Sequence, residues 1–291
     1  MNHHRHVPVL LTEVLDLMRW EKPIDVLVDL TCGGGGHLKA LLEHFSRPKQ
    51  IIAFDQDPLV LSQTRAKLLP YDPIEYHHEN FSKFPELGIQ ADRILLDLGV
   101  SSFQLDDASR GFSFRQDGPL DMRMNPTKGE AAWEFLEHCD EKELADILKN
   151  YGEERKANLF ASRFVRERAK KSIRSTKDFV EALGFHLDSR NRKGRHPLTR
   201  VFQALRIHVN QEFEVLESIL GDLPDLLKKN GRLAIITFHS LEDRAVKWAL
   251  KARLSPINKK VIRASLEEQS ENPRARSAKL RVYEKEGIPD E

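Results

Sequence analysis

The sequence contains little cysteine and no long apolar run. Two cysteines, Cys32 and Cys139, are too few for a disulfide framework or a cysteine zinc site. No hydrophobic stretch approaches the roughly eighteen residues that cross a bilayer, and the first residues lack an apolar secretory segment. The histidines show no His-Glu-x-x-His spacing. These absences predict a cytoplasmic protein without a membrane segment or a bound metal.

Basic charge is concentrated in the middle of the chain, although the formal net charge is only +1. Residues 149–206 contain 16 Lys and Arg against 6 Asp and Glu. Arginine forks bind phosphate and stack on bases, so this clustering favours RNA or DNA as a partner. A membrane is less suited, because no Trp- or Phe-bearing amphipathic helix accompanies this charge. A merely solvated helix face is the simpler alternative.

A glycine-rich turn follows the first apolar strand. Residues 26–30 are apolar except for Asp29, and four glycines, Gly33 to Gly36, lead into a helix that starts near His37. Glycine allows a sharp turn and a close approach of the backbone to a ligand. A second apolar strand ends at Asp55, the position where a carboxylate accepts hydrogen bonds from ribose hydroxyls. Together these features predict a nucleoside site, although a glycine turn can also be a simple connection.

Two nucleoside cofactors compete for such a site, NAD(P) and S-adenosylmethionine. A dinucleotide turn has the spacing G-x-G-x-x-G, which places a pyrophosphate on the helix N-terminus. Here Asp29 precedes four consecutive glycines. A carboxylate would repel a pyrophosphate but attract the ammonium and sulfonium groups of S-adenosylmethionine. The sequence therefore favours S-adenosylmethionine.

The pattern of apolar runs predicts an α/β fold with a helical insertion. Helical periodicity separates the strand-like runs of the first hundred residues, and strand character returns only at residues 231–239 and 280–283. A single long helix bearing Ile207, Phe213, Leu216 and Leu220 is expected before that return. The predicted domains are residues 1–105 and 207–291, which form a doubly wound sheet, and the helical insert 106–206. Expected strands span 25–31, 50–55, 73–79 and 92–99; expected helices span 37–45, 58–69, 131–139, 141–150, 156–169 and 176–187.

Polar residues at the predicted strand ends should line one crevice, which the insert should overhang. They are Asp29, Asp55, Asp97 and His239. Asp97 suits methyl transfer to an exocyclic amine, because its carboxylate would accept hydrogen bonds from the NH₂ group and stabilise the developing positive charge. A strand-end cap or a cofactor contact is an equal alternative for Asp97. For His239 we expect a structural hydrogen bond, and Ser101 and Ser102 suit a helix cap.

A long loop and the basic stretch supply candidate RNA contacts. In residues 110–125, Phe112 or Phe114 could stack on a base and Arg123 could hold a phosphate. Packing beneath the loop is the alternative for either phenylalanine. Arg192, Arg195 and Arg200 are further candidates from the basic region.

Several long segments in fixed order resemble the bacterial small-subunit ribosomal RNA cytosine-N4 methyltransferases, the MraW or RsmH family. The resemblance covers nearly the whole chain and implies a Rossmann-like class I methyltransferase sheet. It also implies S-adenosylmethionine as methyl donor and a decoding-centre cytosine of 16S ribosomal RNA as substrate. The segments are residues 6–11, the glycine turn, 55–58, 95–107, 110–125, 151–155, 196–207, 238–244 and 272–277.

The resemblance also implies a set of cofactor contacts, and two departures from the family pattern affect the site. In the first departure, Cys32 stands where the family usually has phenylalanine and Gly34 where it often has arginine. In the second, the segment of residues 251–272 is shorter than in the family, which puts any RNA contact there in doubt. The implied cofactor contacts are Gly35, Gly36, His37, Asp55, Phe81, Asp97 and Gln104.

Three other functions compete with this one. A DNA amino-methyltransferase would have an [Asp/Asn/Ser]-Pro-Pro-aromatic tetrad after the fourth strand, which this chain lacks. An RNA-binding assembly factor without turnover and an NAD-dependent reductase both stay open. The sequence also leaves open whether the chain forms a homodimer, whether naked RNA is a substrate, and which group accepts the proton.

Overall fold

The computed structural model describes residues 8–186 and 196–286, and the chain divides into two compact units. The first, here called the sheet domain, comprises Met1–Gly99 and Glu214–Glu291. The second, the helical domain, is Val100–Phe213. The sequence analysis placed these boundaries at residues 105 and 206. No helix in the described ranges is long and apolar enough to span a bilayer.

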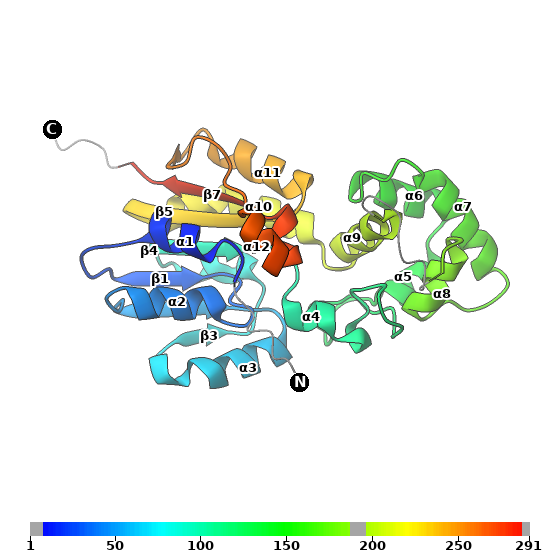
Figure 1. Cartoon of the computed structure of the whole chain (residues 1–291), viewed down its shortest axis with the longest axis horizontal. Coiled ribbons are helices and arrows are strands. Elements are labelled where there is room, and N and C mark those ends of the chain that lie inside the picture. The colour runs from blue at the N-terminus through cyan, green and yellow to red at the C-terminus, as the bar shows by residue number, and fades with distance from the viewer. Residues whose placement is uncertain (1–7, 187–195, 287–291) are drawn as a thin grey trace. The chain divides into compact units, whose positions relative to one another are not determined.

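The sheet domain is built on a seven-stranded sheet with the order β3-β2-β1-β4-β5-β7-β6 (Figure 1). The first five strands in chain order pair in parallel, as the α/β prediction requires. β7 runs antiparallel to β5, and β6 antiparallel to β7, which the sequence analysis did not anticipate. The strands are β1 (Val26–Asp29), β2 (Gln50–Phe54), β3 (Glu75–His77), β4 (Ala91–Asp97), β5 (Leu227–Thr237), β6 (Ser255–Pro256) and β7 (Lys279–Glu284).

Helices cover both faces of the sheet, and this explains why the central strands are apolar throughout. On one face Leu27 and Leu95 belong to a core that includes α1, α2 and α3. On the other face Val28 and Ile94 pack in a core with η2, α10 and α11. Burial on both faces is typical of parallel sheets. The bounds are α1 (Leu11–Met18), α2 (Gly36–His44), α3 (Pro58–Leu68), η1 (Leu69–Tyr71), η2 (Phe81–Leu87), α10 (Glu212–Leu226), α11 (Ser240–Leu250), α12 (Leu266–Glu271) and η4 (Pro273–Ser277).

The strand order reverses between β1 and β4. β1 pairs with β2 on one side, where Asp29 is opposite Ala53, and with β4 on the other, where it is opposite Leu95. Ligands of doubly wound sheets bind outside the carboxyl ends of the strands at such a switch point. Asp29 and Asp97 are the last residues of β1 and β4, and Asp55 directly follows β2.

The helical domain has its own hydrophobic core, to which α5, α6, α7, α8 and α9 all contribute. The periodicity predicted these helices closely, but the predicted helix 176–187 ends at Ala182, and Gly184 with φ 84° follows it. The helices are α4 (Ser102–Asp106), η3 (Ala108–Arg110), α5 (Ala132–His138), α6 (Glu141–Asn150), α7 (Ala157–Arg168), α8 (Thr176–Ala182) and α9 (Pro197–Val209).

The prediction of a single long helix that contains Ile207 and Leu216 is wrong. Ile207 belongs to α9, whereas Leu216 belongs to α10. Asn210 caps α9, and Gln211 has φ 49°. A left-handed residue cannot continue a right-handed helix, so the chain turns there.

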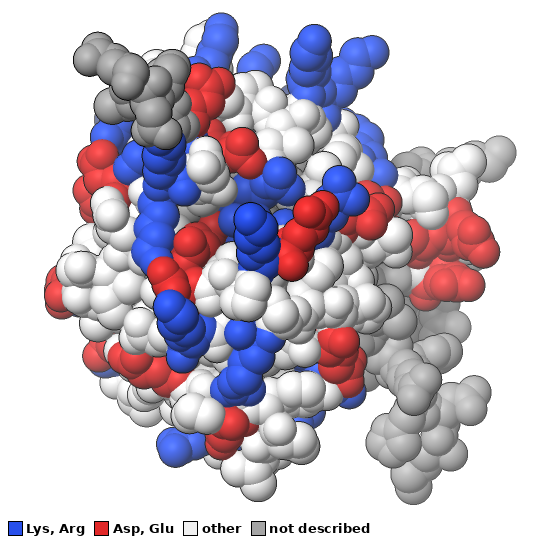
Figure 2. All heavy atoms as spheres, turned by 90° about the vertical axis from the view of Figure 1, so that its left-hand side faces the viewer, with Lys and Arg blue, Asp and Glu red and all other residues white. Residues whose placement is uncertain are grey.

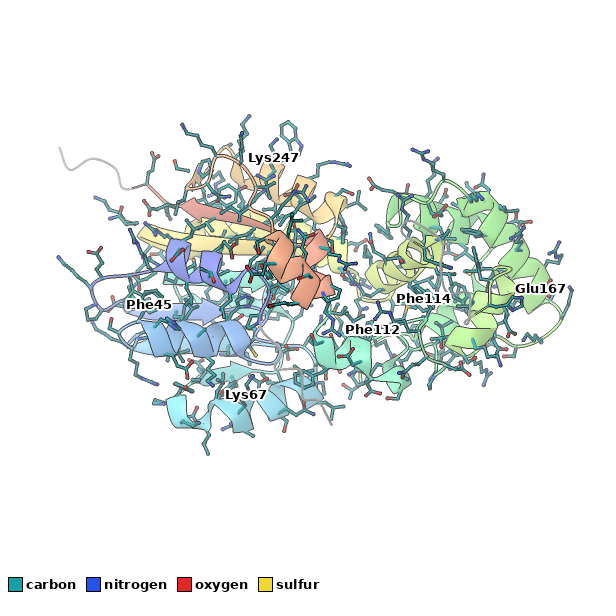
Figure 3. All side chains as sticks on the ribbon, viewed as in Figure 1. Phe45, Lys67, Phe112, Phe114, Glu167 and Lys247 are labelled. Atoms are coloured by element: carbon teal, nitrogen blue, oxygen red, sulfur yellow. The ribbon has the colours of Figure 1, made fainter. Side chains whose placement is uncertain are left out.

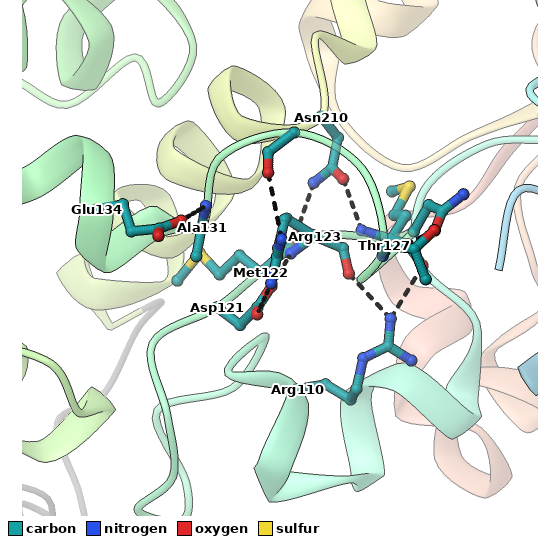
Figure 4. A network of polar contacts seen from close by, with 11 residues as sticks. Arg110, Asp121, Met122, Arg123, Thr127, Ala131, Glu134 and Asn210 are labelled. Atoms are coloured by element: carbon teal, nitrogen blue, oxygen red, sulfur yellow. Dashed lines mark hydrogen bonds and ion pairs between the residues drawn. The ribbon is translucent and has the colours of Figure 1, made fainter.

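Buried hydrogen bonds hold the long loop that follows η3 (Figure 4). The Arg110 guanidinium donates to the carbonyls of Arg123 and Met124, both at 2.9 Å. The side chain of Asn210 accepts from the Met124 N–H at 2.7 Å and donates to the Met122 carbonyl at 2.7 Å. These side chains supply partners for a backbone that lies outside regular secondary structure.

We expect Asn210→Ala to lower the free energy of unfolding of the helical domain by about 2–3 kcal/mol, because it leaves a buried N–H and a buried carbonyl without partners. Urea unfolding followed by circular dichroism measures this loss. Asn150→Ala, at the exposed last residue of α6, is the matched control and should change little. Equal stability of both variants would contradict the assigned role of Asn210.

Candidate functional site

Hydrogen bonds tie the glycine turn to the two strands beside β1. The Leu30 N–H donates to the Leu95 carbonyl of β4 at 2.9 Å, and the Cys32 N–H donates to the Phe54 carbonyl of β2 at 2.8 Å. From α3, Lys67 Nζ donates to the Gly34 carbonyl at 2.6 Å. The turn is thus held from three sides at the carboxyl edge of the sheet.

Gly35 and Gly36 occupy positions with no room for a side chain. Gly35 has φ 69° and caps α2, and a Cβ there would lie 2.8 Å from Thr64 Cγ2. A Cβ on Gly36 would lie 2.5 Å from Pro8 Cγ. The positive φ and these close approaches explain the glycines at both positions. They also keep the first N–H groups of α2 accessible to a ligand.

Asp55 links the glycine turn to the start of α3. Its Oδ2 accepts the Gly33 N–H at 2.9 Å, and its Oδ1 accepts the Asp57 N–H at 2.9 Å. Burial raises the pKa of Asp55 to about 6, although these hydrogen bonds favour the ionised form. A carboxylate oxygen accepts more than one hydrogen bond, so the group still has lone pairs for a ribose hydroxyl.

Asp29 lies beneath the turn and is only 1% exposed. Its Oδ1 accepts the Thr31 N–H at 3.1 Å. Burial, with a smaller contribution from the nearby Asp55 charge, raises the pKa of Asp29 to about 7, although the hydrogen bond from Thr31 favours the ionised form. The sequence analysis expected Asp29 to attract a cationic ligand. In this arrangement it acts on a ligand only through its charge, because its side chain is enclosed.

Asp97 is fixed at the end of β4 by its backbone. Its N–H donates to Thr31 Oγ1 at 2.6 Å, and its side-chain Oδ2 lies 3.6 Å from Nδ1 of His37. Its other oxygen, Oδ1, is buried and has no hydrogen-bond partner within residues 8–186 and 196–286. Burial, then the charges of Asp29 and Glu242, raise the pKa of Asp97 well above its usual range. The carboxyl group therefore has an unused acceptor at the switch point.

His37 is oriented by the segment that precedes α1. Its Nε2 is 2.9 Å from the Val9 carbonyl, which can only accept, so Nε2 carries a proton. Its other ring nitrogen, Nδ1, lies 3.6 Å from Oδ2 of Asp97. Leu10, the next residue, is held in the left-handed region at φ 56°, and its N–H donates to Glu268 of α12 at 2.7 Å. The start and the end of the described sheet domain thus meet behind His37.

The remaining cofactor candidates lie in different units. Phe81 begins η2 in the sheet domain and packs against the core under β1 and β4. Gln104 belongs to α4 of the helical domain, where its Oε1 accepts the Ser101 N–H at 2.9 Å in a capping box. The prediction that Ser101 caps this helix is confirmed. His239 likewise caps α11, where its Nδ1 accepts the Glu242 N–H at 3.3 Å, which agrees with the structural role expected for it.

The candidate RNA contacts in the described residues all lie in the helical domain. Phe112 is 6% exposed and packs in the hydrophobic core under Arg110. This is the packing alternative given for it above, and a base cannot stack on a ring buried in this way. Phe114 is partly buried against His196 and Phe202, with ring centroids 5.4 and 5.3 Å away (Figure 3).

The arginine candidates differ in their contacts. Arg123 pairs with Asp121 through two hydrogen bonds of 2.8 and 2.6 Å, and Arg200 donates to the Glu153 carbonyl at 3.3 Å. Arg192 and Arg195 lie outside the described residues. No set of three His, Cys, Asp or Glu side chains in the described part of the chain is arranged to hold a metal ion.

Sequence reasoning missed the residues that support the site. Thr31 fixes Asp97, Thr64 donates its hydroxyl to the Gly33 carbonyl, and Glu268 holds Leu10. Thr31 lies two residues after β1 and just before the glycines, so its place there was a usable signal. Thr64 and Glu268 contact the site only through the tertiary fold and left no local signal.

The site has a glycine turn at the switch point, an acidic residue after β2 and an acidic residue at the end of β4. These features define a Rossmann-like nucleoside-binding enzyme. Comparison with known proteins assigns this chain to the methylases. Residues 3–286 match the model of the MraW methylase family, so the chain belongs to that family. This is a family of S-adenosylmethionine-dependent methyltransferases. The predicted family, fold class and methyl donor are thereby confirmed.

Relatives from distant bacteria match the chain over nearly its full length. A protein named ribosomal RNA small subunit methyltransferase H from Clostridium botulinum (strain Kyoto / Type A2) is 41% identical to this chain; the match covers 97% of this chain and 99% of that protein. A protein of the same name from Prochlorococcus marinus (strain NATL1A) is 44% identical, and the match covers 98% of this chain and 96% of that protein. Among solved structures, N-methyltransferase NodS from Bradyrhizobium japonicum WM9, in complex with S-adenosyl-L-homocysteine, has a TM-score of 0.46 at 9% identity, over 96% of this chain and 86% of that one.

The buried acids predict a distinct pH dependence of stability. Because the pKa of Asp29 is raised to about 7, ionising it costs folding free energy above pH 7, and the cost disappears as pH falls toward about 4. Asp29→Asn should therefore be more stable than the parent at pH 8, by about 2–4 kcal/mol, and similar at pH 4. Urea unfolding at both pH values measures this. Asp16→Asn, in α1, is the control, and a destabilised Asp29→Asn at pH 8 would contradict the argument.

Proposed function

We propose that this protein transfers a methyl group from S-adenosylmethionine to the exocyclic N4 of a decoding-centre cytosine in 16S ribosomal RNA. Membership of the methylase family supports methyl transfer. The names of relatives 41–44% identical support small-subunit ribosomal RNA as the methyl acceptor. The N4 position rests on the chemistry of the site and on the resemblance of the sequence. We further propose that the enzyme acts in the cytoplasm.

The sheet domain fits the methyl donor. The glycine turn brings the backbone close to the start of α2, Asp55 has acceptor capacity for a ribose, and the acidic side chains of Asp29, Asp55 and Asp97 favour a cation. When bound, the donor supplies an activated methyl group on a sulfonium. The residues proposed to hold it are Gly35, Gly36, His37, Asp55, Phe81, Asp97 and Gln104.

The observation that carries the N4 assignment is the Asp97 carboxyl group, whose side chain is 27% exposed and whose Oδ1 has no hydrogen-bond partner among the described residues. A cytosine NH₂ group is a weak nucleophile because its lone pair is delocalised into the ring. A carboxylate that accepts its N–H localises that lone pair and stabilises the positive charge that forms on the nitrogen. As the nitrogen–methyl bond forms and the sulfur–methyl bond breaks, N4 must lose a proton. Asp97 is the proposed acceptor of this proton, and Nδ1 of His37 lies 3.6 Å from its Oδ2.

The helical domain is proposed to hold the RNA. Several of its arginines serve the fold: Arg163 and Arg168 donate to backbone carbonyls, and Arg206 pairs with Glu212. Other basic side chains, such as Arg155 and Lys156, are exposed at the surface, where phosphates can reach them. Phe114, Arg123, Arg192, Arg195 and Arg200 stay proposed contacts, and Phe112 is left out because it is enclosed.

Methyl incorporation tests the function directly. Purified protein, small ribosomal subunits from cells lacking the gene, and radiolabelled S-adenosylmethionine should yield N4-methylcytidine after nucleoside digestion. Naked 16S RNA in a parallel reaction shows whether the assembled subunit is needed. An unlabelled digest would reject methyl transfer, and label on another nucleoside would reject the N4 assignment.

Asp97→Asn should lower kcat by about a hundredfold or more, because the amide can accept a hydrogen bond but is a poor base. The parent rate should rise with pH until the pH exceeds the raised pKa of Asp97, because the carboxyl group must be ionised before it can accept a proton. The rate of the variant should be nearly independent of pH over the same interval. Single-turnover methylation between pH 6 and 9 measures both, with Asp16→Asn as control. An unchanged kcat would exclude Asp97 as the base.

Asp55→Asn should weaken S-adenosylmethionine binding by about 10- to 100-fold, because a charge-assisted hydrogen bond to the ribose becomes a neutral one. Asparagine keeps one oxygen for the Gly33 or Asp57 N–H, which limits the damage to the turn. Isothermal calorimetry measures the affinity. Asp72→Asn, in the loop before β3, is a matched control. Equal affinities would place the ribose elsewhere.

A further inference from the structure

The outer face of α11, in the sheet domain, carries an aromatic ring among basic side chains. Arg244, Lys247, Trp248 and Lys251 recur at the i, i+3, i+4 and i+7 spacing of one helix face, and all four are exposed. The Trp248 indole is 67% exposed, unlike the buried Trp20. Tryptophan is enriched at interfaces, because its ring offers a large apolar area together with a polar N–H group.

The two lysines lie over the tryptophan ring. Nζ of Lys247 and Nζ of Lys251 are each 5.9 Å from the ring centroid. Lys247 lies on the outer side of α11 in Figure 3, and Lys and Arg side chains project along the upper rim of the sheet domain in Figure 2. The surface thus combines a planar apolar ring with positive charge close to it.

Three acidic groups near this face are paired or buried. Residues 244–253 contain no Asp or Glu. Asp243 binds Lys279 and Arg281 at 3.3 and 2.8 Å, and Glu242 is buried in the cap of α11. Arg253, beyond the helix, pairs with Asp225 at 2.6 Å. The exposed stripe therefore keeps a net positive charge.

We propose that Arg244, Lys247, Trp248 and Lys251 form a second RNA-binding surface, on which an unpaired base stacks against Trp248 while the cations hold the flanking phosphates. This proposal rests on the proposed function, and it adds a contact from the sheet domain to those of the helical insert. Aromatic stacking between basic side chains is the usual mode of single-stranded RNA binding. A protein partner fits less well, because lysine is depleted in protein–protein interface cores.

The test measures binding of the full-length protein to a fluorescein-labelled single-stranded RNA oligonucleotide by anisotropy. Trp248→Ala should bind about tenfold more weakly, because it removes one stacked base, whereas Trp248→Phe should retain most of the affinity. Leu59→Ala, which shortens another side chain that is 57% exposed on the sheet domain, is the matched control and should bind as the parent does. Circular dichroism and the melting temperature verify that each variant is folded.

The charge contribution is tested separately. Lys247→Ala combined with Lys251→Ala should weaken binding at low salt and reduce the slope of log affinity against log salt by about 1–2. Lys22→Ala combined with Lys83→Ala removes the same charge from other exposed positions and should leave the slope unchanged. Tryptophan fluorescence gives a further measure: RNA should quench the parent, and Trp248→Phe should lose that quenching.

Two outcomes would overturn the proposal. One is equal RNA affinity of the parent, Trp248→Ala and the double-lysine variant. The other is unchanged RNA affinity with lost association to whole small subunits, which would assign the surface to a ribosomal protein. Methyl incorporation by the parent is a separate measurement, so failure of the proposed function would be distinguished from failure of this surface.

Discussion

The site depends on hydrogen bonds between the backbone of the glycine turn and the ends of the neighbouring strands. Gly33 donates to the carboxylate of Asp55 after β2, and Thr31 accepts from the backbone of Asp97 at the end of β4. These bonds connect three parallel strands through one short turn. A change in the turn would therefore displace both carboxyl groups together. Glycine makes the required backbone path available, and the threonines and α3 keep the path fixed.

The same bonds bring three acids close together in a poorly solvated place. Asp29, Asp55 and Asp97 each have a raised pKa, mainly through burial, and the charges of Asp29 and Asp55 add to this. Such a group of acids lowers the stability of the protein when it is ionised and unpaired. A nearby sulfonium or ammonium group would favour the ionised carboxylates and so lower these pKa values. Functional sites commonly combine lower stability with higher activity in this way.

Local signals in the sequence were enough to predict the turn, the acids at the strand ends and most of the helices. Parallel strands buried on both faces are continuously apolar, and a glycine run after such a strand is distinctive. The direction of β7 was not predictable, because four apolar residues have the same pattern in either direction. The break between α9 and α10 was missed because Asn210 and Gln211 interrupt the backbone but not the apolar periodicity. The enclosure of Asp29 and Phe112, and the contact of Val9 with His37, arise from tertiary packing that no short window contains.

The bond between Leu10 and Glu268 joins residues 258 positions apart. During synthesis the glycine turn is made long before the carboxylate that holds Leu10, because Glu268 follows far along the chain. Val9, which orients His37, is adjacent to this contact. A nascent chain that has not yet reached Glu268 therefore lacks one of the contacts that fix the segment beside His37.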